Sequence, residues 1–265
     1  MPELPEVEVM RSYFEEAAGN LQISDVEFLD PLNKVYKSPK PEISKNLVGQ
    51  HFISTQRIGK YLFAGLSNGK WLHLHFGMTG SLQVYTDDYS LPQYTRMAIH
   101  FEDGSRLAFI DSRKFGRVEI IHSLDDYRDK GTLGIDLLEI KPDDFVKALV
   151  HRKIPIKAAL LEQKHFAGIG NWIADEMLFE TGIHPEEPCY KLSEKELKAL
   201  LSSAVAIVKV AIRKDTHYGD FPEDFFVNYR KKGAVHPNHP HSKVESMRVG
   251  GRGTFIVPEK QKLKK

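Results

Sequence analysis

The spacing of apolar residues changes once along this chain, and that change limits the folds that it can adopt. From Ile23 to about His122, apolar residues alternate with polar ones or form short runs, as in HFISTQRI, KYLFAGL, WLHLHF and RMAIHF. Turn sequences such as SNGK and EDGS, which favour tight hairpins, separate these runs. Short strands joined by tight turns predict an antiparallel β-sandwich or barrel.

Helical spacing precedes and follows these strands. Residues 5–18 begin with a proline and an acidic turn and are followed by Gly19, a pattern that predicts a helix. From about Lys141, helices are predicted for FVKALV, IKAALLEQ, NWIADEMLFETG and SEKELKALLSSAVAIVKVAIRK, the last with a capping box of Ser193 and Glu196. SMRVGGRGTFIVP predicts one more hairpin near the C-terminus.

The sequence therefore predicts an α+β protein in three parts. Residues 1–130 form an antiparallel β-sandwich with an N-terminal helix, residues 131–225 form a helical domain, and residues 226–265 form a hairpin with a basic tail. Residues 225–265 carry 10 Lys or Arg and 2 Asp or Glu, a net +8, so that −7 falls on the rest of a chain whose total is +1. This asymmetry indicates either a surface that meets a polyanion or a solvated basic tail.

Composition argues against several classes of protein. No run of about 18 apolar residues occurs, so neither a membrane-spanning helix nor a membrane partner is expected. The opening MPELPEVEV lacks the basic and then apolar segments of a signal peptide. Cys189 is the single cysteine, which excludes an internal disulfide and fits a reducing compartment.

Seven motifs, spread over nearly the whole chain, carry a resemblance to a known family. They are MPELPEVE, GKYL, HFGMTGSL, DSRKFG, IKAALLEQ, GIGNWIADEMLFETGIHP and GGRGTF. In this order and at this spacing they resemble the formamidopyrimidine-DNA glycosylase and endonuclease VIII family, and Leu4 resembles the formamidopyrimidine branch. The resemblance implies a catalytic β-sandwich, a helix–two-turn–helix DNA-binding domain and a finger hairpin.

The opening Met-Pro implies a nucleophile. Removal of Met1 would expose the secondary amine of Pro2, and an α-amino group with a pKa of about 8 is roughly one-tenth neutral at pH 7. Attack of this amine on the sugar C1′ gives an iminium directly, and the cation acidifies the C2′ hydrogen so that the strand can be cut by elimination. An isolated Met-Pro carries no such meaning; here the accompanying motifs make Pro2 the predicted nucleophile.

Three further residues complete the predicted catalytic set. Glu3, beside Pro2, can act as a general acid on the sugar oxygen and shuttle protons. Lys60 lies at the turn between two predicted strands, and the resemblance implies that it assists proton transfer and contacts a backbone phosphate. Arg252 matches the finger arginine of the family, which implies contact with the phosphates flanking the lesion and assistance to the second elimination.

A base inside a duplex is out of reach of such a site, so the nucleotide must be flipped out and the gap filled. Met78, Arg113 and Phe115 match the family's intercalating residues, and a thioether, a planar cation and an aromatic ring suit stacking and base-edge contacts. By themselves Met78 and Phe115 would be interpreted as core residues. Their neighbours in FGMTG and SRKFG favour loop tips instead.

Further DNA contacts are implied by the helix–two-turn–helix motif. Gly168 and Gly170 allow a tight turn, Asn171 opens the next helix, and the free amides and dipole of that helix favour a phosphate. Lys157 is predicted as a second phosphate contact. Tyr94 stands where the family has a histidine that helps to hold DNA; whether the nearby Arg96 compensates stays open.

The finger departs from the family pattern, because many members bind zinc there through two pairs of cysteines. Aligned on GGRGTF, the matching positions are His236, His239, Val257 and Lys260, and the last two are not zinc ligands. We therefore predict no metal and no other cofactor, and a zincless hairpin held by backbone hydrogen bonds. Adventitious metal on His236, His239 and His241 is the alternative to solvated loop histidines, which are favoured.

These observations predict a bifunctional DNA glycosylase and abasic-site lyase of base excision repair. Its expected partner is double-stranded DNA with an oxidised base or an abasic site, on which it acts as a monomer, in the bacterial cytoplasm or nucleoid or in the eukaryotic nucleus. One alternative is an endonuclease VIII-like enzyme for oxidised pyrimidines. Another is a damage-sensing DNA-binding protein without turnover, which would not need the four catalytic residues.

One segment bears on the choice of lesion. DTHYGDFPEDFFVN, between the long predicted helix and YRKKG, is too short for the loop that covers a flipped 8-oxoguanine in typical bacterial members, once FPEDFF is set aside as a further helical turn. A pocket without that loop reads the small difference between 8-oxoguanine and guanine poorly. The sequence therefore predicts efficient removal of formamidopyrimidines and hydantoins and weak removal of 8-oxoguanine.

Overall fold

The computed structural model describes residues 2–86, 90–129, 131 and 133–264. The chain divides into two compact units: Met1–Pro2 with Glu6–Gly131, and Glu3–Pro5 with Thr132–Lys265. The second unit contains both the predicted helical domain and the predicted hairpin segment. It also contains residues 3–5, although nothing in the sequence sets them apart from their neighbours.

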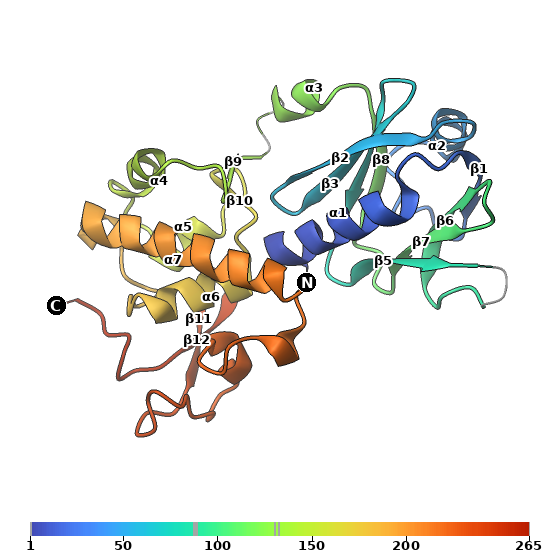
Figure 1. Ribbon diagram of the computed structural model, residues 1–265. Helices are drawn as coiled ribbons and strands as arrows, with labels where there is room; N and C mark the ends of the chain where they lie inside the picture. Colours follow the sequence, from blue (N-terminus) through green and yellow to red (C-terminus); the bar gives the residue numbers. More distant parts are fainter. Residues whose placement is uncertain (1, 87–89, 130, 132, 265) are drawn as a thin grey trace. The chain divides into compact units, whose positions relative to one another are not determined.

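The first unit contains two separate four-stranded antiparallel sheets, which the ribbon in Figure 1 displays. This arrangement confirms the predicted β-sandwich and rules out the alternative, a barrel. Two predicted hairpin turns are present, with Gly69 at φ 83° and Gly104 at φ 86°. One sheet has the order β1 (Ile23–Phe28), β6 (Thr95–Phe101), β7 (Arg106–Asp111), β5 (Gly80–Tyr85). The other has the order β2 (Phe52–Ile58), β3 (Tyr61–Leu66), β4 (Trp71–His75), β8 (Arg117–Ile121).

The sheets share a buried core with helix α1 (Leu4–Ala18). Val7, Phe14 and Ala18 lie on one side of α1 because seven and eleven residues are close to whole numbers of helical turns. The ring of Phe14 meets that of Phe52 edge to face at 4.8 Å. The helix ends where it was predicted to end, before Gly19.

Two short helices were not predicted: one interrupts the region that was predicted as strands, and the other follows it directly. Helix α2 (Lys40–Leu47) has a proline in its first turn, where the missing N–H costs nothing, and it buries Ile43 and Leu47. The sequence analysis placed this segment within the region of strands and did not predict a helix there. Helix α3 (Leu124–Asp129) was also missed, because six residues hold too few apolar positions to show a period.

The second unit is helical around its own core, with helices α4 (Pro142–Leu149), α5 (Ile156–Leu160), α6 (Asn171–Glu180) and α7 (Glu194–Arg213). The predicted capping box of α7 is confirmed. Helix α5 is shorter than the predicted IKAALLEQ. A two-residue parallel pair joins β9 (Ile135–Asp136) to β10 (Phe166–Ala167), and among the described residues no helix is long and apolar enough to cross a membrane.

The predicted C-terminal hairpin is formed by β11 (Glu245–Val249) and β12 (Arg252–Ile256). Its loop is Gly250–Gly251, at φ 57° and 76°, a left-handed pair that suits a two-residue hairpin turn. Single 3-10 turns lie at η1 (Cys189–Lys191), η2 (Tyr218–Asp220) and η3 (Phe226–Tyr229). Within FPEDFF the N–H of Phe225 donates to the carbonyl of Pro222 at 3.0 Å, and this single turn leads into η3.

Candidate active site and nucleic-acid interface

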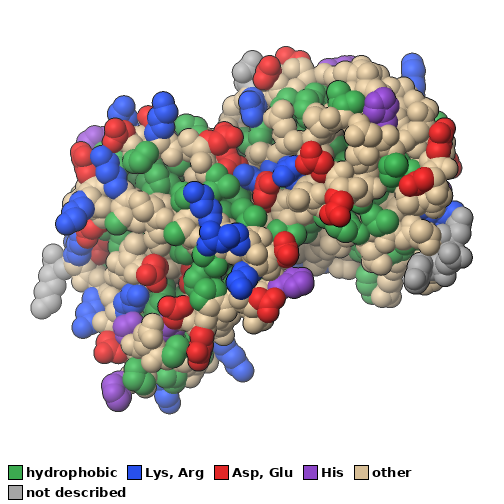
Figure 2. All heavy atoms as spheres, viewed as in Figure 1, with side chains coloured by type: hydrophobic (Ala, Val, Ile, Leu, Met, Phe, Trp, Pro, Cys, Tyr) green, Lys and Arg blue, Asp and Glu red, His purple; other side chains and the backbone are tan. Residues whose placement is uncertain are grey.

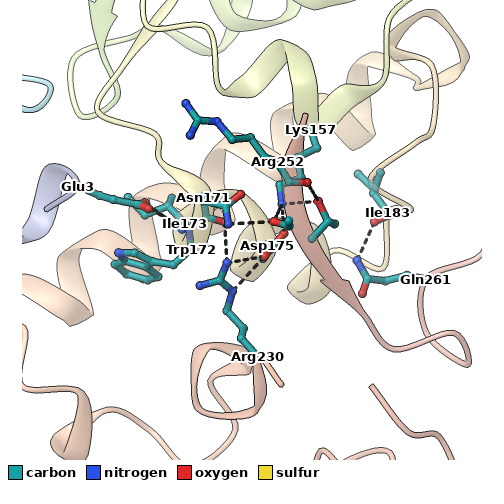
Figure 3. Close-up of polar contacts among 12 residues, drawn as sticks. Glu3, Lys157, Asn171, Trp172, Ile173, Asp175, Ile183, Arg230, Arg252 and Gln261 are labelled. Carbon is teal, nitrogen blue, oxygen red and sulfur yellow. Dashed lines mark hydrogen bonds and ion pairs between the residues drawn. The ribbon is translucent and has the colours of Figure 1, made fainter. Parts of the chain in front are cut away.

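The carboxylate of Glu3 lies at the N-terminus of α6, and the side chain is only 2% exposed. The N–H of Trp172 donates to Oε1 at 2.9 Å and the N–H of Ile173 donates to Oε2 at 3.2 Å, as Figure 3 shows. Two amide donors and the positive end of the helix fix the carboxylate and stabilise its charge. These two amides hold Glu3 and so are not free for the phosphate that the sequence predicted there.

The two glycines of the GIGN motif make room for the start of the chain. A Cβ on Gly168 would lie 2.6 Å from Leu4 Cδ1, and a Cβ on Gly170 would lie 2.0 Å from Glu3 Cδ. The N–H of Leu4 also donates to the carbonyl of Gly168 at 3.3 Å. Close approach of residues 3 and 4, as much as a tight turn, therefore explains these glycines.

Pro2 and Lys60 both belong to the first unit. Lys60 follows Gly59, at φ 58°, in the turn between β2 and β3, as predicted. It is 9% exposed, unlike an ordinary hairpin lysine.

His75 is a residue that the sequence reasoning missed. Burial, together with nearby cations that include Lys60, lowers its pKa to about 4, so the imidazole is neutral. Its Nδ1 accepts the N–H of Gly77 at 3.2 Å and so fixes the start of the loop that carries Met78. The position of the histidine, directly between strand and glycine-rich loop, was the available signal.

Asp111 joins the two loops that carry the predicted intercalating residues. It is buried, and its Oδ1 accepts the hydroxyl of Thr79 at 2.6 Å and the N–H of Arg113 at 3.2 Å. Its Oδ2 accepts the N–H of Gly116 at 2.7 Å. These bonds hold the Met78 loop against the Arg113 loop.

The three side chains that these loops carry are exposed. Met78 is 39% exposed and Phe115 is 53% exposed, so both lie at loop tips and not in the core. The guanidinium of Arg113 lies over the ring of Phe115, with 4.9 Å from Cζ to the centroid. The structure thus brings the three together on one surface of the first unit.

Tyr94 adjoins the same loops. It is 50% exposed with φ 64°, and its carbonyl accepts the N–H of Asp111 at 3.1 Å. Arg96 Nε donates to the carbonyl of Asp111 at 2.8 Å, and its Cζ lies 6.0 Å from the Tyr94 ring. Arg96 thus helps to hold the backbone on which Tyr94 stands.

Lys157 is not available as the predicted phosphate contact. It is fully buried, and its ammonium donates to Asp175 Oδ1 at 2.6 Å, Thr254 Oγ1 at 2.7 Å and the Gly253 carbonyl at 3.1 Å. All three hydrogens are used inside the protein. Burial lowers the pKa of Lys157, and the carboxylate of Asp175 opposes that shift.

Asn171 begins α6, as predicted, and its amide Nδ2 donates to the Gly253 carbonyl at 3.0 Å. Arg252 is exposed and is the first residue of β12 after the two-glycine turn. Because Gly253 follows Arg252 directly, the bond from Asn171 to the Gly253 carbonyl brings Asn171 close to the backbone of Arg252 within the second unit.

Figure 2 shows the charged side chains on the face that carries α7. Lysine, arginine and acidic side chains are interspersed on this face, so the charge asymmetry of the sequence does not form a continuous basic surface there.

The four positions that match zinc ligands gather around one ring, that of Phe179. The centroid of His236 lies 4.6 Å from it, that of His239 lies 5.9 Å away, and Lys260 Nζ lies 4.1 Å away. Val257 is buried in the same apolar cluster, in which Phe226 stacks on Phe179 at 4.5 Å. Besides the backbone bonds of the hairpin, aromatic packing therefore holds the finger (residues 226–265).

The interpretation of His236 as a solvated loop histidine is wrong. The residue is fully buried. Its Nδ1 accepts the N–H of Asn238 at 3.2 Å, so the hydrogen of the neutral imidazole is on Nε2. This Nε2–H group donates to the carbonyl of Asp224 at 2.9 Å. Burial lowers its pKa. His241 is exposed, and among the described residues no group of three or more His, Cys, Asp or Glu could hold a metal ion.

Comparisons with known proteins agree over almost the full length. Residues 1–118 match the family model of the "Formamidopyrimidine-DNA glycosylase N-terminal domain", and residues 134–221 match that of the "Formamidopyrimidine-DNA glycosylase H2TH domain". The formamidopyrimidine-DNA glycosylases of Arabidopsis thaliana and Listeria innocua are each 32% identical, over 99% of this chain and 71% and 100% of theirs.

Solved structures are also similar. The formamidopyrimidine-DNA glycosylase of Lactococcus lactis, bound non-covalently to DNA that contains an abasic site, superimposes with a TM-score of 0.88. The two share 28% identity over 98% of this chain and 100% of that one. With relatives of this identity matched over their full length, this chain belongs to the formamidopyrimidine-DNA glycosylase family.

Proposed function

We propose that this protein is a bifunctional DNA glycosylase and abasic-site lyase in which Pro2 is the nucleophile and Glu3 the proton donor. As a member of its family it is a DNA glycosylase of base excision repair that acts on double-stranded DNA. The observation that carries the catalytic assignment is the buried Glu3 carboxylate, held by two amides directly after Pro2 in the chain. A protein that only senses damage has no use for a fixed carboxylate beside its terminal amine.

The chemistry follows from an amine and a carboxyl group. Once Met1, which lies outside the described residues, is removed, the neutral Pro2 nitrogen attacks C1′, and the base leaves with the electron pair of the C1′–base bond and takes up the proton that the amine loses. The protonated carboxyl group of Glu3 then gives its proton to the ring oxygen as the bond between C1′ and that oxygen breaks. The product is an iminium between Pro2 and C1′. Loss of a C2′ proton then expels the 3′ phosphate, and loss of a C4′ proton expels the 5′ phosphate; both leave with their bonding electron pairs.

The other residues hold the substrate. Lys60 carries protons and contacts a phosphate, and Arg252 contacts the phosphates beside the lesion and supports the second elimination. Met78, Arg113 and Phe115 enter the stack and fill the space of the flipped nucleotide, while Asn171 and Tyr94 contact the DNA backbone. The exposure of these three loop side chains on one surface supports their insertion into the base stack.

Borohydride trapping on abasic-site DNA tests the nucleophile. Reduction of the iminium should give a denaturation-resistant protein–DNA band with the C-terminally tagged protein and none with an N-terminal tag that blocks the amine. Pro2→Gly should lose most of the trapping, whereas Pro5→Ala, in the first turn of α1, should keep it. Efficient trapping by the N-terminally tagged protein would exclude Pro2, and binding of abasic DNA without nicking would favour the damage sensor.

The preferred lesions are part of the proposal: formamidopyrimidines and hydantoins are removed efficiently and 8-oxoguanine weakly. The segment after α7 is short and fixed at several points. Tyr218 packs edge to face on Trp172 at 6.2 Å, Phe221 is 6% exposed, and Asn228 Nδ2 donates to the carbonyl of Pro222 at 3.0 Å. Few residues are left to fold over a flipped base, which supports poor discrimination of 8-oxoguanine.

A single-turnover comparison of these lesions opposite cytosine, in one sequence context, tests this ranking. Release of 8-oxoguanine as fast as the hydantoins would mean that another element, such as the Tyr94 region, covers the base. Preference for oxidised pyrimidines over both would favour an endonuclease VIII-like enzyme. We further propose that the protein acts as a monomer, at the bacterial nucleoid or in the eukaryotic nucleus.

A further inference from the structure

A buried ionic network lies where α6 meets the finger, and Figure 3 shows it from one side. The carboxylate of Asp175, which is 1% exposed, accepts Lys157 Nζ on Oδ1 at 2.6 Å. Its Oδ2 accepts Arg230 Nη2 at 2.7 Å and Nε at 3.0 Å. One anion thus balances two cations, of which Lys157 is fully buried and Arg230 has an 18% exposed side chain.

This network is hydrogen-bonded to Gly253 and Thr254, the two residues of β12 that directly follow Arg252. Lys157 donates to the carbonyl of Gly253 and to the hydroxyl of Thr254, and Asn171 donates to the same Gly253 carbonyl. The Thr254 hydroxyl in turn donates to the Arg252 carbonyl at 3.2 Å. Two consecutive carbonyls, those of residues 252 and 253, are therefore held from the interior.

The other side of Arg252 is also fixed. Gly250, in the hairpin turn, lies so close to α5 that a Cβ there would be 2.9 Å from the Cβ of Ala158. Its φ of 57° favours glycine as well. In Figure 3 the Arg252 side chain extends away from the hydrogen-bonded cluster. The backbone of Arg252 is anchored on both sides while its guanidinium remains outside the network.

We propose that Asp175 is a positioning residue for Arg252: its carboxylate holds Lys157 and Arg230 together and thereby fixes the backbone that aims the finger arginine. This inference rests on the proposed function, in which Arg252 serves the second elimination. Asp175 touches neither DNA nor the reacting atoms in that scheme. Its influence passes through Lys157, Gly253 and Thr254.

Electrostatics explains why the carboxylate is needed. Without it, two cations would face each other in a region from which water is largely excluded, and an unpaired buried charge is strongly unfavourable. Arg230 lies in the finger ahead of the hairpin, and Lys157 lies on α5, so their separation would shift the hairpin on α5 and α6. Glu3 is bonded to Trp172 and Ile173 and not to Asp175, so base release should be affected less than the step that needs Arg252.

The test uses Asp175→Asn, which keeps the size of the side chain and removes its charge. On duplexes with a single abasic site, the ratio of δ-product (3′ phosphate) to β-product (unsaturated aldehyde) should fall by about 10-fold to 100-fold, the range for a slightly misplaced catalytic group. Borohydride trapping, which reports on Pro2, should stay near the wild-type level. Asp143→Asn, which removes the exposed ion pair with Lys198, is the matched control and should change neither readout.

A double variant distinguishes positioning from general loss of stability. If Asp175 acts through Arg252, then Asp175→Asn should add little to the product ratio of Arg252→Ala. Additive losses, or an unchanged ratio in folded Asp175→Asn, overturn the inference. If Asp175→Asn does not fold, Thr254→Val decides, because it removes only the hydroxyl that links Lys157 to the Arg252 carbonyl; a lower ratio supports the inference and an unchanged one overturns it.

Failure of the proposed function would look different. In that case the wild-type protein itself would give no trapped band, or Arg252→Ala would leave the product ratio unchanged. When wild type and Arg252→Ala behave as proposed and Asp175→Asn resembles wild type, only the role of Asp175 is refuted.

Discussion

The carboxylate of Glu3 and the backbone N–H of Trp172 are 2.9 Å apart, although 169 positions separate them in the chain. Glu3, which belongs to the second unit although it lies near the start of the chain, thereby caps helix α6 of the same unit. The same bond orients the carboxyl group that we expect to donate a proton during base release.

Glu3→Gln should separate the two activities. Both oxygens of the Glu3 carboxylate accept an N–H group of α6, whereas the NH₂ group of a glutamine cannot accept one. One α6 N–H group would therefore lose its acceptor, which should lower the free energy of unfolding by about 1–3 kcal/mol. Loss of the proton donor should slow release of a formamidopyrimidine by about 10²-fold to 10⁴-fold. Cutting of a preformed abasic site, which has no base to release, should fall much less.

Single-turnover assays on the two substrates, with urea unfolding alongside, measure these effects. Glu16→Gln, on the exposed side of α1, is the control and should leave both rates unchanged. Equal losses on both substrates would show that Glu3 serves stability or elimination and not base release.

Arg252→Ala should change how salt affects DNA binding. Each phosphate contact releases counterions, so removal of one should reduce the slope of log K against log salt concentration by about one unit. The variant should also lose δ-product more than base release. Binding titrations at several salt concentrations test this, with Lys198→Ala as a control because that ammonium pairs with Asp143. An unchanged slope would mean that Arg252 is an ordinary surface residue.

Strand cleavage should survive a strong chelator, because the finger packs around the ring of Phe179 and two of its four matching positions, Val257 and Lys260, are not zinc ligands. Elemental analysis of the purified protein should find well under one zinc per chain. Phe179→Ala removes the ring around which the finger packs and should lower the free energy of unfolding by about 3–5 kcal/mol. Stoichiometric zinc, or loss of cleavage on chelation, would show that the histidines bind metal after all.

Glu176 should make stability depend on pH. Its burial raises its pKa from 4.5 to about 7, although the N–H groups of Phe226 and Val227 donate to it at 2.8 and 2.7 Å. Between these pH values the folded state keeps a proton that the unfolded chain releases, so stability should fall as pH rises from 4.5 to 7. The loss is on the order of 3 kcal/mol at most, since each pKa unit corresponds to about 1.4 kcal/mol.

Unfolding free energies at several pH values between 4 and 8 measure this dependence. Glu176→Gln should flatten the curve, because it cannot ionise, and it should be less stable than wild type at low pH, because one of the two N–H groups loses its acceptor. A variant that retains the full wild-type slope would assign the proton to another group.

Local chemistry made much of this structure predictable from sequence. The capping box of Ser193 and Glu196, the hairpin glycines and the loop positions of Met78 and Phe115 depend on residues close in the chain. The short helix α2 was not predicted, because prolines at its N-cap and in its first turn are not typical of a helix interior.

Burial of polar groups could not be predicted, because it depends on distant partners. Lys157 looked like a surface lysine until Asp175 and Thr254 supplied its acceptors, and His236 looked solvated until Asp224 and Phe179 enclosed it. The role of the GIGN glycines likewise depends on Glu3 and Leu4, far away in sequence. A single sequence shows such residues but not the surroundings that change their chemistry.

The capping of α6 by Glu3 also bears on how the protein comes into being. During synthesis the N-terminus leaves the ribosome first, yet the amides of Trp172 and Ile173 that orient Glu3 do not exist until well over half of the chain has been made. A nascent or prematurely ended chain therefore carries the reactive amine without its ordered carboxylate. Base release, which needs that ordered carboxyl group, is therefore expected only of chains in which α6 has already been made.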